Sequence, residues 1–231
     1  MKSTVVSLFV FLLWALPSGT PVTAAPGEPI GLLSKVILEV AWKEAGKTWE
    51  RASRGQMLGT GDMVRTGPAS LAIIKFKDNS LVHLRERSEL TVTGTTKSGS
   101  FSKSVEIQTG VVGFNVAKQR SGEEFRFTSP TSVASIRGTS GALNASSGSD
   151  TLVVIEGAVK LTNRRSSKFV DVSAGFTGIS NGDGSVLSRA STERERRLAA
   201  DALLSEQRKK LELELRNPQG KTNRLKIEYT D

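Results

Sequence analysis

Residues 71–84 read LAIIKFKDNSLVHL and show the pattern that recurs through most of the chain. Two short apolar runs, Leu71–Phe76 and Leu81–Leu84, lie on either side of Asp78-Asn79-Ser80. Aspartate, asparagine and serine favour tight turns because their side chains bond to nearby backbone groups. Apolar runs on both sides of such a turn predict two antiparallel strands. We therefore expect a β-hairpin here.

The same alternation of strand and turn fills residues 31–187. Further apolar runs are Val105–Ile107, Phe125–Phe127, Leu152–Ile155 and Ala158–Leu161. Clusters of glycine, serine, asparagine and proline separate the runs at roughly 8–12 residues, a spacing typical of all-β domains. We predict one all-β domain over this range.

Two segments of this range are similar to each other. Residues 106–112 read EIQTGVV and residues 154–159 read VIEGAV, so in each a strand reaches a glycine and valine follows. Recurrent units of this kind can stack as a solenoid or β-roll, because glycine allows a tight bend. The expected fold is a solenoid-like or β-roll stack of short strands with one C-terminal α-helix. A sandwich would give the same local pattern.

Residues 188–231 differ in composition and predict a helix followed by a strand. Thr192 and Glu195 form a capping-box pattern, which favours a helix over about residues 192–216. The apolar positions on one face of this helix are Ala200, Leu204, Leu211 and Leu215. Leu225–Tyr229 alternates like a final strand. The helix either docks on its own domain or binds a partner.

The first 24 residues have the layout of a secretory signal peptide. Lys2 gives a positive start, Val5–Leu16 is apolar, and small residues lead to Ala24. The rival interpretation is a membrane anchor, but an apolar run of this length is shorter than the ~30 Å hydrocarbon core. We expect cleavage after Ala24, a short linker over residues 25–30, no membrane span in the mature chain, and a periplasmic or secreted location.

Composition removes most enzyme chemistry from consideration. The chain has 231 residues, no cysteine and one histidine, His83, which we expect at the surface or rim of a strand. Disulfides, thiolate sites and most histidine-based sites are therefore excluded. We expect no catalytic, metal-binding or cofactor-binding residues.

The net charge of +9 has two interpretations. It can simply keep the protein soluble, or it can attract anions. Outside the cytoplasm those anions are lipid head groups, cell-wall polymers or an acidic protein, so we expect no nucleic-acid partner.

Several stretches, in order along the chain, resemble the FecR-type periplasmic domain family. The stretches are Gly55–Thr66, Ser70–Ser80, Val105–Val112, Thr128–Pro130, Ile136–Thr139 and Val154–Val159. Asn79 stands where the family usually has glycine, and Phe176 stands where it has a polar residue after Ala174-Gly175. The resemblance covers roughly residues 31–176.

The resemblance implies an all-β fold of solenoid-like coils. The best-known members of the family are sensors that carry a cytoplasmic segment controlling a sigma factor, followed by a membrane helix and this periplasmic domain. Here no such segment precedes the predicted signal peptide. We therefore expect a simple exported member without the anti-sigma role.

The family motifs contain residues that we expect to shape turns. These positions are Gly61, Asp62, Asp78, Arg137, Gly138, Thr139 and Gly157. Glycine permits positive φ, and aspartate can accept hydrogen bonds from the backbone of its own turn. Arg137 carries a planar donor fork suited to a carboxylate, so we expect it to pair with an internal acid such as Glu156, or with an acidic ligand.

These observations favour a non-enzymatic exported envelope protein. Its expected role is protein–protein interaction or scaffolding, with an envelope protein as partner and a connection to signalling. A second hypothesis is binding of cell-wall or another anionic envelope polymer, using basic charge and Trp42 or Trp49. A third is a hydrolase with two carboxylates brought together by the fold.

Overall fold

The computed structural model describes residues 29–97, 100–205, 209–216 and 222–229. The predicted signal peptide and residues 25–28 of the predicted linker lie outside these ranges. The domain boundary between residues 187 and 188 stays a prediction. No helix in the described ranges is long and apolar enough to cross a membrane.

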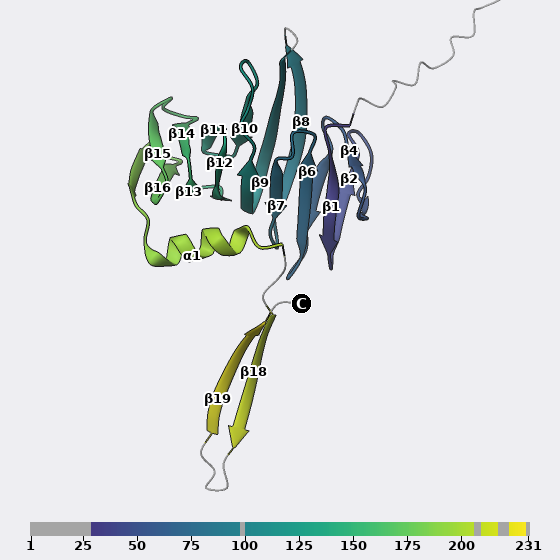
Figure 1. The fold of residues 1–231 in the computed structure, drawn as a ribbon, viewed down its shortest axis with the longest axis vertical. Coiled ribbons are helices and arrows are strands. Elements are labelled where there is room, and N and C mark those ends of the chain that lie inside the picture. Colours follow the sequence, from purple (N-terminus) through teal and green to yellow (C-terminus); the bar gives the residue numbers. More distant parts are fainter. Residues whose placement is uncertain (1–28, 98–99, 206–208, 217–221, 230–231) are drawn as a thin grey trace, which may run out of the picture.

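Seventeen strands form one hydrogen-bonded network that folds into two layers (Figure 1). Layer A contains, in spatial order, β4 (Met57–Leu58), β1 (Gly31–Ile37), β6 (Leu71–Phe76), β7 (Leu81–Leu84), the second half of β9 (Ser100–Val116), β12 (Thr139–Ala145), β13 (Ser149–Glu156), β16 (Phe176–Asn181) and β17 (Val186–Ala190). Layer B contains β3 (Glu50–Arg51), β2 (Val40–Lys43), β5 (Met63–Thr66), β8 (Glu89–Lys97), the first half of β9, β10 (Phe125–Thr128), β11 (Ser132–Ile136), β14 (Ala158–Asn163) and β15 (Phe169–Ser173).

Strand β9 joins the two layers. Its residues up to Thr109 pair with β8, and those from Gly110 onward pair with β12. Gly110 lies at the change of layer with a φ of +99°, and the position of a Cβ atom there is occupied by Ser88. Only glycine fits this bend without strain.

After β9, successive hairpins alternate between the layers. β10–β11 lies in layer B, β12–β13 in layer A, β14–β15 in layer B and β16–β17 in layer A. Among the described strands, only β9 and β10 pair in parallel. The predicted all-β fold with one C-terminal helix is confirmed, and the units that stack are antiparallel hairpins.

The hydrophobic core lies between the layers. Phe76 of layer A meets Phe125 of layer B with ring centroids 5.1 Å apart, and Phe114 meets Phe127 at the same distance. All four rings are buried. Strands such as β10 and β14 alternate inward apolar residues with outward polar ones, as the side-chain period of a strand requires. The hairpin predicted from residues 71–84 is β6–β7.

Helix α1 (Glu193–Ala202) begins where the sequence predicts. Thr192 is its N-cap, and the reciprocal bonds of the capping box with Glu195 are present. The predicted end near residue 216 is wrong, because the helix stops at its C-cap, Leu203.

A separate hairpin follows the helix. It consists of β18 (Lys209–Arg216) and β19 (Thr222–Tyr229), and Figure 1 shows it extending away from the two layers. Residues 209–216 read KKLELELR, whose alternation has the period of a strand. The helical spacing of Leu211 and Leu215 was thus misleading. The predicted final strand, Leu225–Tyr229, is part of β19.

Helix α1 docks on the outer face of layer A (Figure 1). Ala199 and Ala202 pack against Ala142 and Val153, on β12 and β13. This result confirms that the helix docks on its own domain.

The prediction of a surface or rim position for His83 is wrong. His83 faces outward from β7, but it is only 3% exposed. Its Nδ1 lies 3.4 Å from the carbonyl oxygen of Leu204, just beyond the helix, so the end of α1 and the following segment cover it.

Candidate functional site

The family-motif residues lie at separate turns. Asp62 is buried at the start of β5, where Oδ1 accepts the backbone N–H of Ala45 at 3.1 Å and Oδ2 accepts that of Gly59 at 2.8 Å. The neighbouring Gly61 has a φ of +88° and donates its N–H to Val92 O at 2.8 Å. These contacts tie the turn before β5 to two other segments.

Asp78 holds the turn of the β6–β7 hairpin to β9 and to the segment after it. Its Oδ2 lies 3.0 Å from Nζ of the buried Lys103, and the Gln119 amide donates to it at 2.8 Å. Burial by itself would raise the pKa of the Asp78 carboxyl. Hydrogen bonds from Gln119, Lys103 and Ser80 outweigh burial and leave the pKa below its usual 3.8.

Gly138, Thr139 and Gly157 meet at one corner of the two layers. A Cβ atom on Gly157 would lie 2.8 Å from both Gly138 O and Thr139 Oγ1, and Gly157 has a φ of +82°. Thr139 Oγ1 donates to Ala158 O at 3.1 Å. The turn before β12 and the turn before β14 can therefore lie this close together only because residue 157 has no side chain.

Arg137 lies beside this corner and is exposed. The expected pair with Glu156 is absent from the described ion pairs: the Glu156 carboxylate instead accepts a long hydrogen bond of 3.5 Å from Ser140. The motif residues therefore do not form one site, and each group contacts the backbone or side chains of a turn. Within the described ranges, no cluster of three or more histidine, cysteine or acidic residues is placed to hold a metal ion.

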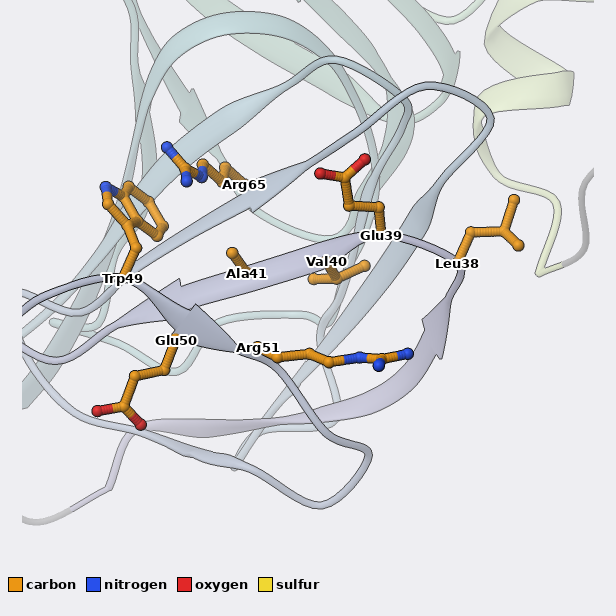
Figure 2. Close-up of a pocket in the computed structure, with 8 residues that line it drawn as sticks. All are labelled: Leu38, Glu39, Val40, Ala41, Trp49, Glu50, Arg51 and Arg65. Carbon is orange, nitrogen blue, oxygen red and sulfur yellow. The ribbon is translucent and has the colours of Figure 1, made fainter.

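An open groove of about 650 Å³ is the strongest candidate site (Figure 2). It lies at the β3 edge of layer B and is lined by Leu38, Glu39, Val40, Ala41, Trp49, Glu50, Arg51 and Arg65. β2 lies between β3 and β5, so three neighbouring strands and the turn before β2 build it.

The alternation of β2 sets the floor of the groove. Val40 is buried and faces the core, so the next residue, Ala41, faces outward. Ala41 pairs with Arg51 on one side and with Arg65 on the other. A short side chain between two long ones leaves a depression across the outer face.

Trp49 and Arg65 form one end of the groove. The Arg65 guanidinium lies 4.2 Å from the centroid of the Trp49 ring, and Lys43 Nζ lies 5.4 Å from it, so the ring orients both cations. Trp42 differs, because it packs against the core. The hypothesis that one of these tryptophans lies at a binding surface thus applies to Trp49.

Leu38 and Arg51 form the other end. Leu38 is 65% exposed and has a φ of +58°, in the turn between β1 and β2. Figure 2 shows Arg51 extended towards Leu38, while Arg65 points towards Trp49. Each end of the groove therefore combines a guanidinium group with an apolar side chain.

The charges of the groove are unevenly distributed. Arg51 and Arg65 share the outer face with Lys43, Glu39 and Glu89, which is the register partner of Arg65 on β8. Glu50 is the register partner of the inward-facing Trp42. Neither arginine forms an ion pair with any described residue. The outer face thus presents two unpaired guanidinium groups, which are suited to binding carboxylates.

Of the residues that line the groove, the sequence indicated Trp49 but not Leu38, Arg51 or Arg65. Arg51 and Arg65 are 14 positions apart in the printed sequence, and nothing local indicates that both pair with Ala41. The sequence does contain one indication for Arg65. It follows the apolar residues Met63 and Val64 in a strand-like segment, and this alternation places its side chain on the outer face of a strand.

Residues 62–160 match the family model described as FecR protein. This part of the chain is thus similar to FecR domains. The match runs from the start of β5 into β14, so it includes Arg65 but not Trp49 or Arg51.

Solved structures give a weaker comparison. Two crystal structures described as "a putative anti-sigma factor from Parabacteroides distasonis" align with 17% identity and a TM-score of 0.49. The alignment covers 58% of this chain and 62% of theirs, so the chain spans less than two thirds of those proteins. The search of curated proteins gave no match.

Proposed function

We propose that the protein is a non-catalytic interaction module of the cell envelope, connected to signalling, which binds a partner protein through the groove between Leu38 and Trp49. The observation that carries the proposal is the open groove with Trp49 and two unpaired arginines. Tryptophan and arginine are enriched among the residues that dominate protein–protein binding energy. The FecR domain match supports a regulatory role.

The motif residues support the non-catalytic part of the proposal. The Asp62 carboxylate accepts backbone hydrogen bonds within its turn, and the Asp78 carboxylate forms an ion pair with Lys103. Both carboxylates therefore have a structural role. The single histidine is covered by the segment that follows α1.

Site-specific photo-cross-linking in cells tests the proposed partner. A photoreactive phenylalanine derivative replaces Leu38, and the matched control replaces Leu198, which is 58% exposed on α1. We expect a defined adduct from position 38 and none of the same mass from position 198. No adduct from position 38 in whole cells or envelope fractions contradicts the proposal.

The proposed location has its own test. Export by the predicted signal peptide gives a mature protein that begins at Ala25 and fractionates with the periplasm or the medium. N-terminal sequencing of the purified protein checks the cleavage, and a chain that retains Met1 in the cytosol contradicts it.

Binding of an anionic envelope polymer is the second candidate. The net charge of +9 and the two unpaired arginines favour it. It predicts co-sedimentation with isolated cell wall that weakens as salt rises, because screening removes attraction between exposed charges.

A further inference from the structure

The chemistry of the groove indicates the kind of segment that it binds. We infer that the groove takes an extended acidic segment of a partner protein, with one carboxylate at Arg65 beside Trp49 and another at Arg51 beside Leu38. This inference rests on the proposed function and specifies its partner.

The charged side chains on the outer face favour an anionic ligand. Strand alternation places Arg51, Arg65 and Lys43 outward, and the acidic residues on the same face are Glu39 and Glu89, the register partner of Arg65 on β8. Glu39 is adjacent to the end of β5, where Gly67 donates its N–H to Glu39 O at 2.8 Å. Basic side chains therefore outnumber acidic ones on this face by one, and the two arginines without an ion pair to a described residue suit an anionic ligand.

The two guanidinium groups lie well apart in the groove. Arg51 and Arg65 are register partners of Ala41 from opposite sides, so two strand spacings, about 10 Å, separate their backbones. Their side chains point to opposite ends of the groove (Figure 2). One carboxylate cannot satisfy both, whereas an extended segment with acidic residues at two places can.

Each of the two arginines has an apolar side chain beside it. Arg65 lies over Trp49, which fixes its plane and adds apolar area. Arg51 extends towards Leu38, an apolar side chain that is 65% exposed. An acidic residue flanked by an apolar one complements each end, because the carboxylate meets the guanidinium while the apolar side chain is removed from water.

A peptide fits this groove better than an acidic polysaccharide. Sugars bind tryptophan by stacking on an open ring face. The Trp49 ring already has the Arg65 guanidinium at 4.2 Å and Lys43 Nζ at 5.4 Å. The ring therefore presents cations to a ligand, and the apolar contact comes from Leu38.

Calorimetric titration of the purified protein tests the inference. The probe is an acetylated and amidated peptide of three Glu-Leu-Glu-Thr repeats, and the control peptide has lysine in place of each glutamate. We expect the acidic peptide to bind and the basic one not to bind. Arg51→Glu and Arg65→Glu should each weaken binding of the acidic peptide by about tenfold, because reversing the charge converts attraction into repulsion.

The matched control variant is Arg194→Glu, which makes the same change of charge at an exposed position of α1. We expect it to bind the acidic peptide within about twofold of the original protein. An equal loss in all three variants would mean that the peptide senses only net charge, and it would overturn the inference. Binding of polygalacturonate that needs Arg51 and Arg65, with no binding of the peptide, would also overturn it.

Failure of the inference and failure of the proposed function give different results. If position 38 cross-links a partner and the Arg51→Glu, Arg65→Glu double variant still binds that partner, the module stands and the acidic-segment inference falls. If position 38 gives no cross-link to any protein, the proposed function falls, whether or not the acidic peptide binds.

Discussion

At the scale of single residues, the two-layered fold depends on positions where the backbone leaves no room for a side chain. Gly157 is the clearest case, since a Cβ atom there would lie 2.8 Å from two atoms of the neighbouring hairpin. Gly175 has a similar φ of +80°, but nothing lies within 4 Å of its Cβ position. A side chain at position 157 would therefore cause both steric overlap and backbone strain, whereas a side chain at position 175 would cause backbone strain alone.

Gly157→Ala is expected to lower the free energy of unfolding by about 3 kcal/mol, because it adds overlap to the strain of a positive φ. Gly175→Ala is expected to cost about 1 kcal/mol, which is the strain alone. Urea unfolding followed by circular dichroism measures both. Equal losses in the two variants would show that the corner at Gly138 relaxes around the new methyl group.

The pair of Asp78 and Lys103 should make stability depend on pH. The pKa of Asp78 in the folded protein is below its usual 3.8, so the folded state favours the ionised carboxylate. This contribution is present above pH 3.8 and is lost as the pH falls through the folded-state pKa.

Asp78→Asn should lower the free energy of unfolding by about 3 kcal/mol near pH 7, because it leaves the buried Lys103 cation without its anion. The variant should also lose the part of the pH dependence that belongs to Asp78. Urea unfolding at several pH values measures both effects, with Asp171→Asn on the exposed face of β15 as the control. A variant with unchanged stability and unchanged pH dependence would contradict this account.

At the scale of elements, α1 is held on layer A by a small apolar contact and by polar contacts near its two ends. Only Ala199 and Ala202 are buried among its residues. The Arg85 guanidinium donates to Leu204 O at 3.1 Å just after the helix, and Arg189 pairs with Glu195 at 2.7 Å near its start. The Glu195 carboxyl has its pKa lowered to about 2, chiefly by the hydrogen bond from Arg189.

Gly113 of β9 lies directly beneath the end of α1, where a Cβ atom would overlap Ala202 O. Gly113→Ala should therefore push the helix from the sheet, at a cost of about 2 kcal/mol, and raise hydrogen exchange of α1 amides by about tenfold or more. Gly148→Ala is the control, since its Cβ position is open. Unchanged exchange in α1 would mean that the helix shifts without loss of docking.

The elements also show what the sequence could and could not predict. Turn residues such as Asp78 and the period-two runs predicted the hairpins, because both signals are local. The end of the helix was mispredicted, since leucines four residues apart satisfy a helix and a strand alike. The groove could not be predicted, because it exists only where β2 separates β3 from β5, and that pairing joins segments distant in the chain.

At the scale of the whole molecule, two kinds of structure are present. Most described strands share one core between the layers, where Phe114 and Phe127 come into contact. The β18–β19 hairpin, in contrast, pairs only with itself among the described strands. An isolated two-stranded hairpin is marginally stable in water, so we expect it to add little to the stability of the body.

Truncation of the chain after Ser205 tests this division. The shortened protein should keep its β-rich circular dichroism spectrum and a Tm within about 2 °C of the original, because all core strands and α1 remain. Truncation after Ser191 removes α1 as well and should lower Tm by about 5 °C or more, since Ala142 and Val153 then lose their cover. A large fall in Tm from the first truncation alone would show that the segment after Ser205 packs against the two layers, and the body would then not be independent of the hairpin.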